Sequence, residues 1–351
     1  MAIALRTPLC HRLGIEVPIF NAGIGSGAGP ELAAAVSNAG GFGVIGASGL
    51  EPDEISRRIA HVRTLTDRPF GLNFIIAEES DEDREFIRAE IRAAIGEKVA
   101  AVVVFWGDPG VYVEEVHAHG VAILIQVGSV EEAEAAAAAG VDAVIAQGVE
   151  AGGHVSGTTS IWELLPKTIE ALGPLPVLAS GGIGDGAGVA RALGLGAQGV
   201  SLGTRFVASD EAWVHPEYKR RVVASAAEDT VYTTDLYDVG WPDAPHRTLR
   251  NKNFEEWEQA GCPPSGERPG EGTVIGVRRL PSGETSEWPR YASGMLTPTF
   301  EGAIDYAPMW AGESCSVVNE VKPAGEIVRD LAREAEGALA GPDWTRPQGR
   351  T

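Results

Sequence analysis

The sequence has few cysteines and lacks a long apolar run. Its three cysteines, Cys10, Cys262 and Cys315, are far apart and form no CxxC pair, so neither a zinc cluster nor a disulfide framework is indicated. No stretch of roughly 18 apolar residues occurs, and the apolar run at the N-terminus is too short for a signal peptide. We therefore expect a cytoplasmic protein with no membrane span and no bound metal.

Basic residues are also scarce. The 28 lysines and arginines are outnumbered by 49 aspartates and glutamates, which gives a formal net charge of -21. Such a charge repels nucleic acid and anionic lipid surfaces, so both are excluded as expected partners. Hydrophobic residues make up 44% and charged residues 22%, an ordinary balance for a globular protein long enough to bury a large core.

Three common catalytic motifs are missing as well. The chain has no G-x-S-x-G nucleophile elbow, no Walker P-loop and no HExxH zinc motif. The glycine-rich loop at 23–29 resembles a loose dinucleotide fingerprint, but no acidic residue stands at the end of the next expected strand. A Rossmann-type nicotinamide site is therefore not favoured.

Apolar strands and helical patterns alternate through the first two thirds of the chain. Each expected strand is followed by a helical pattern, which matches a closed (β/α)8 TIM barrel better than an open doubly wound sheet. The strands are expected at 17–21, 42–45, 70–76, 99–105, 122–126, 142–146, 177–179 and 199–202. The helices between them are expected at 30–39, 51–65, 81–95, 109–119, 129–139, 161–172 and 185–195, with Ser129 as an N-cap. Residues 1–228 are interpreted as this α/β barrel.

The texture changes after a helix expected at 216–226. Residues 229–300 are interpreted as an inserted subdomain rich in Trp, Gly and Pro, and residues 301–351 as a C-terminal segment that returns to the barrel through a helix at 324–340. A long excursion of this kind is expected to pack on the barrel, where it covers the open end or docks a second subunit. A homodimer is left open.

Two glycine turns lie in the stretch from Val177 to Phe206. A turn with Gly181 and Gly182 follows the seventh strand, and Gly203-Thr204 follows the eighth. Free backbone N–H groups at such turns bind anions, and the loops after strands seven and eight hold phosphate in many barrels. A phosphate-bearing cofactor or substrate at Gly182, Gly203 and Thr204 is one interpretation; the alternative is that these glycines only let helix and strand pack closely.

Polar side chains at other strand ends suggest the chemistry. His154 follows Ala151-Gly152-Gly153 after the sixth strand, where an imidazole can exchange a proton near neutral pH; the alternative is an ordinary surface histidine. Asn73 and Gln147 carry amides that suit the pyrimidine edge of a flavin, although such residues often only cap strands. Glu150 is given no role, and Trp106 is interpreted as a packing residue. The six other histidines are also given none: His11, His61, His117, His119, His215 and His246.

With these residues in place, the chain resembles the nitronate monooxygenase (2-nitropropane dioxygenase) family. The matching motifs are PIFNAG at 18–23, AVSNAGGFGVIGA at 35–47, GLNF at 71–74, QGVEAGGHVSG at 147–157, LLP at 164–166, SGGIGDG at 180–186 and SLGTRF at 201–206. The resemblance implies an FMN-dependent oxidoreductase that oxidises alkyl nitronates with O2 to a carbonyl compound and nitrite. It implies that His154 is the catalytic base, which removes the α-proton of a neutral nitroalkane. By the same resemblance FMN would contact Ala22, Gly23, Asn73, Gln147, Gly152, Gly181, Gly182, Ser201, Leu202, Gly203 and Thr204.

The chain departs from the family pattern at one place. Many members have a Pro-Met pair against the flavin where this chain has Gly23-Ile24. The packing beneath the flavin, and with it the substrate, is therefore open. Two alternatives also stay open: an NAD(P)H-dependent flavin reductase acting on an enoyl thioester or quinone, and a flavin-binding scaffold without turnover.

Overall fold

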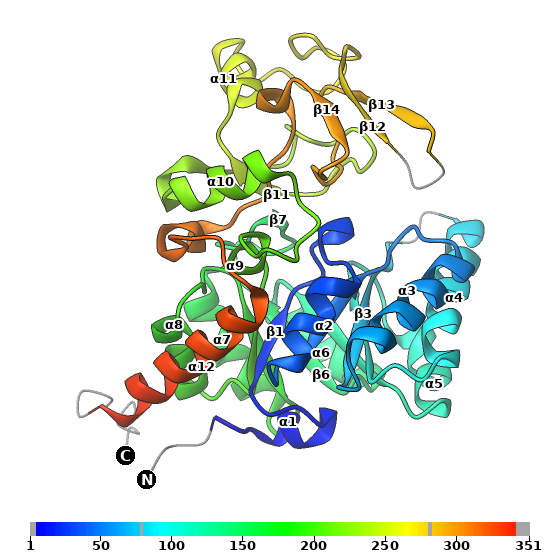
Figure 1. Cartoon of the computed structure of the whole chain (residues 1–351), viewed down its shortest axis with the longest axis vertical. Coiled ribbons are helices and arrows are strands. Elements are labelled where there is room, and N and C mark those ends of the chain that lie inside the picture. The colour runs from blue at the N-terminus through cyan, green and yellow to red at the C-terminus, as the bar shows by residue number, and fades with distance from the viewer. Residues whose placement is uncertain (1–4, 78–79, 280–282, 342–351) are drawn as a thin grey trace.

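The computed structural model describes residues 5–77, 80–279 and 283–341, and its centre is a parallel eight-stranded barrel (Figure 1). The strand order is β1-β9-β8-β6-β5-β4-β3-β2, and a parallel bridge between Phe20 and Phe42 brings β1 beside β2. The predicted TIM barrel is therefore confirmed. Its strands are β1 (Ile19–Asn21), β2 (Gly43–Gly46), β3 (Phe70–Ile75), β4 (Ala101–Phe105), β5 (Ala122–Val127), β6 (Ala143–Gln147), β8 (Val177–Ser180) and β9 (Gly199–Leu202).

Seven helices follow the first seven barrel strands and bury their apolar faces on the outside of the sheet. Polar caps fix several of their starts: Ser80 and Ser129 accept hydrogen bonds from the N–H groups of Asp83 and Glu132. Gly140 ends one helix with a φ of 94°, a conformation that favours glycine. The helices are α2 (Pro30–Asn38), α3 (Pro52–Leu65), α4 (Asp81–Gly96), α5 (Gly110–Ala118), α6 (Val130–Ala139), α7 (Ile161–Leu172) and α8 (Gly186–Gly194).

The eighth outer helix comes from the far end of the chain. Only the short α9 (Thr204–Val207) follows β9 directly, and α12 (Ala324–Ala340) packs against both α8 and α2. Glu334 of α12 accepts a hydrogen bond from the N–H of Gly186 at the start of α8. The C-terminal helix therefore fills the remaining gap in the outer ring, beside the first barrel helix.

A short helix that the sequence did not predict closes the opposite end of the barrel. Helix α1 (Pro8–Leu13) buries Leu9, Cys10 and Leu13 against side chains that fill the barrel interior, such as Leu124 and Leu178. Thr7 caps this helix and donates a hydrogen bond to the carbonyl of Gln198. Because that end is filled, access to the barrel is left at the carboxyl ends of the strands.

The excursion between α9 and α12 packs on the open end of the barrel, as predicted, and forms an upper lobe in Figure 1. One of its strands, β11 (His246–Leu249), pairs with β10 (Thr230–Thr233) and with β7 (Gly153–His154), which belongs to the loop after β6. A second sheet has the order β13-β12-β14, from β12 (Val274–Arg279), β13 (Thr285–Pro289) and β14 (Phe300–Gly302). The remaining elements are α10 (Pro216–Ala224), α11 (Lys252–Gln259), and the 3-10 turns η1 (Gly25–Gly27), η2 (Ala227–Asp229), η3 (Ile304–Tyr306) and η4 (Glu313–Val317). In the described part of the chain, no helix has the length and apolar character needed to cross a bilayer.

Candidate active site

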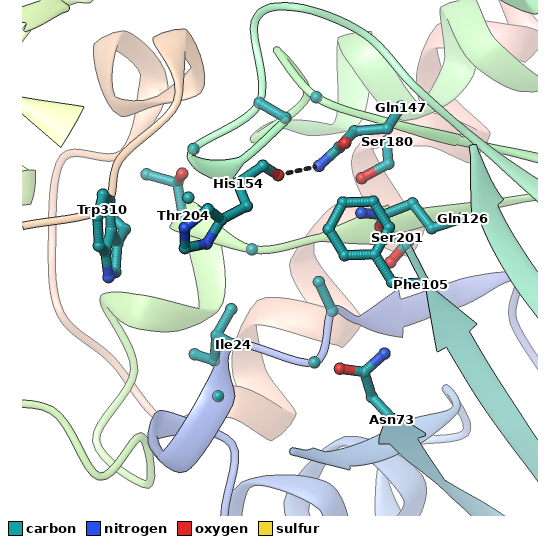
Figure 2. Close-up of a pocket in the computed structure, with 18 of the residues that line it drawn as sticks. Ile24, Asn73, Phe105, Gln126, Gln147, His154, Ser180, Ser201, Thr204 and Trp310 are labelled. Carbon is teal, nitrogen blue, oxygen red and sulfur yellow. Dashed lines mark hydrogen bonds between the residues drawn. The ribbon is translucent and has the colours of Figure 1, made fainter. Parts of the chain in front are cut away.

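A cavity of about 270 Å³ lies at the carboxyl ends of the barrel strands, beneath the excursion (Figure 2). Ten of the eleven residues predicted to contact a cofactor line it together with His154. Leu202 is the exception, because its side chain is 1% exposed and packs in the outer core between sheet and helices. The ten are Ala22, Gly23, Asn73, Gln147, Gly152, Gly181, Gly182, Ser201, Gly203 and Thr204.

Amide and hydroxyl groups point into one side of the cavity. Asn73 of β3 donates from Nδ2 to the carbonyl of Val103, and Gln147 of β6 donates from Nε2 to the carbonyl of His154 (Figure 2). Gln147 is 4% exposed, yet its Oε1 has no hydrogen-bond partner among the described residues. Since a buried acceptor is normally paired, this oxygen is suited to accept a bond from a ligand with N–H groups.

The side chain of Asn73 fills the space next to Gly23. A Cβ at this position would lie 2.3 Å from the Cγ atom of Asn73. The space beside the β1 loop is therefore taken by the Asn73 amide, and a proline at residue 23 would collide with it. At the position of the usual Met, Ile24 lines the cavity.

The two predicted glycine turns meet at one end of the cavity. Gly181 and Gly182 follow β8 with φ angles of 95° and 67°, which L-residues rarely adopt, and Gly203 is the N-cap of α9. The hydroxyl of Thr204 accepts a bond from the N–H of Gly312. Because the described lining residues include no Lys or Arg, an anion at this end would be held by backbone N–H and hydroxyl groups.

His154 lies at the centre of an aromatic cluster. Its ring centroid is 4.0 Å from that of Trp241 at an interplanar angle of 33°, and 5.4 Å from that of Trp310. Burial, with a smaller contribution from nearby His246, lowers the pKa of His154 to about 3. The imidazole is thus neutral at physiological pH, and its Nε2 has no hydrogen-bond partner in the part of the chain that the structure describes.

Several cavity residues were missed in the sequence. Gln126, one residue before the end of β5, is a polar side chain after an apolar run. The same signal singled out Asn73 and Gln147, so this residue could have been found. Trp241, Met295 and Trp310 come from the excursion and its return, where no local pattern marks them. Tyr218 of α10 fixes this wall by donating its hydroxyl hydrogen to the carbonyl of Trp310.

Trp106 and Glu150, which follow β4 and β6, make contacts within the protein. Trp106 packs edge-on against Phe105 and Trp241, with ring centroids 5.1 Å and 5.3 Å away. Glu150 accepts hydrogen bonds from the Ser160 hydroxyl and the Ile161 N–H, so it stabilises the start of α7. In the described ranges, no group of three or more His, Cys, Asp or Glu side chains is placed to hold a metal ion.

Known proteins share this architecture. A family model described as nitronate monooxygenase matches residues 6–334. The chain is 32% identical to a nitronate monooxygenase of Pseudomonas aeruginosa, over 93% of this chain and 98% of that protein. It is 36% identical to a (3aS,4S,5R,7aS)-5-hydroxy-7a-methyl-1-oxo-octahydro-1H-indene-4-carboxyl-CoA dehydrogenase of Mycobacterium tuberculosis, over 72% of this chain and 69% of that protein.

Two solved structures are similar over nearly the whole length. FabK from Thermotoga maritima superposes with a TM-score of 0.75 at 33% identity, covering 95% of this chain and 97% of that chain. A nitroalkane oxidase from Streptomyces ansochromogenes gives a TM-score of 0.76 at 26% identity, covering 94% of this chain and 98% of that chain. With the barrel and the matching family model, these similarities establish that the chain is an oxidoreductase belonging to the nitronate monooxygenase family.

Proposed function

We propose that this enzyme binds FMN and oxidises alkyl nitronates with O2 to a carbonyl compound and nitrite. Atoms and charge balance when two nitronate anions and one O2 give two carbonyl compounds and two nitrite ions. The observation that carries the proposal is a buried imidazole whose Nε2 has no partner among the described residues, in one cavity with the unpaired Oε1 of Gln147 and two glycine turns. Bound FMN supplies the redox chemistry, and the protein supplies position and electrostatics.

The residues present fit this cofactor. Asn73 and Gln147 would hold the pyrimidine edge, since their amides can both donate and accept, and the unpaired Gln147 oxygen needs such a donor. The turns at Gly182 and Gly203-Thr204 would hold the phosphate. Ala22, Gly23, Gly152, Gly181 and Ser201 would line the rest of the site, and Leu202 would contribute only backbone.

His154 is proposed as the group that handles the substrate proton. At neutral pH the uncharged imidazole has one ring nitrogen without a hydrogen that can accept a proton, but the lowered pKa makes the imidazole a weak base. An already ionised nitronate needs no such step. We therefore expect nitronates to be turned over readily and neutral nitroalkanes slowly.

The base role is tested with His154→Asn. Because a positioned base contributes about 10² to 10⁴ in rate, this variant should lose most turnover of a neutral nitroalkane and retain more with the preformed nitronate. Nitrite release, measured with both forms of one compound, gives the comparison. Equal losses on the two forms would remove the proton-abstraction role and leave His154 as a binding residue.

The phosphate site is tested with Gly182→Asp. A carboxylate at this turn should repel the phosphate, so the variant should be purified without flavin. Gly173→Asp is the matched control, because Gly173 also has a positive φ of 59° but has nothing within 4 Å of a built Cβ. Absorbance spectra measure flavin content, and a Gly182→Asp protein with a full FMN spectrum would contradict the assignment.

A second candidate is an NAD(P)H-dependent flavin reductase that acts on an enoyl thioester or quinone. The similarity to a CoA-thioester dehydrogenase and to FabK favours it. Anaerobic mixing of the purified protein with NADH or NADPH separates the two candidates. Rapid bleaching of the flavin would favour the reductase, whereas an unchanged spectrum together with nitrite formation from nitronates would favour the oxidase.

A further inference from the structure

One buried imidazole joins both ends of the segment that covers the site. This segment, residues 237–246, is called the capping loop. The ring of His246 bonds through Nδ1 to the carbonyl of Ala244 at 2.9 Å and through Nε2 to the N–H of Tyr237 at 3.2 Å. Because a carbonyl only accepts and an N–H only donates, Nδ1 carries the hydrogen and Nε2 is unprotonated. The two backbone partners therefore fix one neutral tautomer, in a residue that is 0% exposed.

The capping loop carries Trp241 onto His154. Gly240 and Asp243 flank the tryptophan with φ angles of 97° and 54°, and the Trp241 N–H donates to the carbonyl of Asp238 at 3.0 Å. Among the described residues, the indole N–H of Trp241 has no hydrogen-bond acceptor. The ring is therefore held on the His154 imidazole, 4.0 Å away, by the backbone of the loop and by stacking.

The pairing of β7 with β11 positions both His154 and His246. His246 of β11 lies opposite His154 of β7 in the antiparallel register, and the ring centroids are 5.9 Å apart. The beginning of the loop and the residues before it are anchored separately, because Arg268 donates to the carbonyl of Asp235 at 2.7 Å and to the carboxylate of Asp238 at 2.6 Å. Val239 pairs with Ala292, and the carbonyl of Pro245 accepts from the N–H of Val155. Among the described residues, the turn at 240–243 between these two anchors has no side-chain hydrogen bond of its own, and His246 closes it through Ala244.

We propose that His246 is a positioning residue, which closes the capping loop and thereby holds Trp241 on the His154 imidazole, keeping that ring dry and in one orientation. This role rests on the proposed function of His154 as the reacting imidazole. The titratable side chains that line the cavity within the described residues are His154 and Tyr218, and His246 stands behind them on β11. Removal of the cover therefore changes the solvation of His154 without bringing in a new charge.

The test compares His246→Phe, which loses both ring hydrogen bonds, with His246→Gln, whose amide can donate and accept at the same two ends. The control is His119→Phe. The exposed His119 ring also bonds a backbone carbonyl, that of Glu115 at 2.9 Å, but His119 is the C-cap of α5 on the outside of the barrel. The protein is labelled with 5-fluorotryptophan, and the Trp241 resonance is identified by its loss in Trp241→Phe. A second NMR titration follows the pKa of His154 in each variant.

We expect the Trp241 resonance of His246→Phe to move toward that of free fluorotryptophan, and the pKa of His154 to rise toward its ordinary value of about 6.5. Turnover of a neutral nitroalkane, which needs the His154 proton step, should fall about 10- to 100-fold in kcat with little change in KM, the size expected when a reacting group is misplaced, and turnover of the preformed nitronate should fall less. His246→Gln and His119→Phe should keep the wild-type values. Trp241→Ala, which leaves both His246 hydrogen bonds in place, should raise the pKa of His154 as well, and it tests the link between Trp241 and His154 independently of whether His246→Phe folds. If His246→Phe does not fold, a moved Trp241 resonance in His246→Gln would overturn the role of the two ring hydrogen bonds.

A Trp241 resonance that does not move in a folded His246→Phe would overturn the proposal that His246 holds Trp241 in place. A resonance that moves while the pKa of His154 stays low, in this variant and in Trp241→Ala, would overturn the link to His154. If the wild-type protein releases no nitrite from nitronates, the proposed function fails, but the two NMR measurements still decide the role of His246.

Discussion

Glu90 is a buried carboxyl group far from the proposed chemistry. It lies on α4 with 1% exposure, and its Oε1 accepts a hydrogen bond from the N–H of Leu50 at 3.0 Å. Burial raises its pKa to about 7 from an ordinary value of 4.5. Between these two pH values the folded protein binds a proton at Glu90 that the unfolded chain has released. The stabilisation is therefore complete below pH 4.5 and is lost as the pH rises through about 7.

The substitution Glu90→Gln should remove this pH dependence. Its amide oxygen can still accept from Leu50, and it carries no charge above neutral pH. Relative to wild type, the variant should gain free energy of unfolding as the pH rises from 5 to 8, by up to about 1.4 kcal/mol per pH unit over the affected range. Urea denaturation at several pH values measures this free energy, and Glu85→Gln, at an exposed position on the same helix, is the control. If the free energy of unfolding of Glu90→Gln and of wild type changed in parallel from pH 5 to 8, the Glu90 carboxyl would not titrate in this range.

At the scale of elements, the site depends on a close crossing of two backbone segments. A Cβ on Gly152 would lie 2.4 Å from the carbonyl carbon of Ala311, and a Cβ on Gly312 would lie 2.4 Å from the carbonyl oxygen of Glu150. The return from the excursion thus lies directly on the loop that leads to β7. His154 is held from one side by β11 and from the other by this crossing, although the segments are far apart in sequence.

Gly312→Ala should disturb this crossing. Its φ of -87° suits alanine, so any effect comes from the new methyl group and not from backbone strain. Overpacking of this kind costs about 1–3 kcal/mol, and here we also expect a lower flavin content, because Gly312 bonds the Thr204 hydroxyl. Denaturation curves and absorbance spectra measure both effects. Gly96→Ala, with nothing within 4 Å of its Cβ, is the control; wild-type values for Gly312→Ala would show that the crossing has room to spare.

For the whole molecule, the junction of α8 with α12 closes the outer layer. A Cβ on Gly186 would lie 2.1 Å from the Cβ of Glu334, so the two helices approach as closely as a glycine permits. Because α12 also packs against α2, this junction ties the end of the chain to the start of the barrel.

Gly186→Ala should separate the two helices and lower the free energy of unfolding by about 1–3 kcal/mol. Gly337→Ala lies within α12 with nothing within 4 Å of its Cβ, and should instead stabilise by up to about 1 kcal/mol through helix propensity. Chemical denaturation distinguishes the two, and a stabilised Gly186→Ala would contradict the tight junction.

The proposed boundaries at 228/229 and 300/301, a homodimer and a cytoplasmic location stay predictions.

Local patterns in the sequence were enough to predict the barrel. The eight barrel strands and the seven helices between them were predicted to within a few residues, because apolar periodicity, caps such as Ser129 and turn glycines act over short distances in the chain. The ends of parallel strands meet at one edge, so Asn73, Gln147, His154 and the glycine turns could be grouped before the fold was known. Alternation along β9 would also have set Leu202 apart from Ser201, since neighbouring strand residues face opposite sides.

Long-range contacts decided what the local patterns left open. Helix α1 is only six residues long, and its burial in the barrel floor depends on side chains from six different strands. The wall around His154 depends on the pairing of β7 with β11 and on Trp241 and Trp310, which lie roughly 90 and 160 residues after His154 in the chain. Such pairings carry no local signature, because their stability comes from surfaces that exist only after the barrel has closed. The sequence alone therefore determined the barrel and the edge that bears the chemistry, and the tertiary structure determined what surrounds the imidazole.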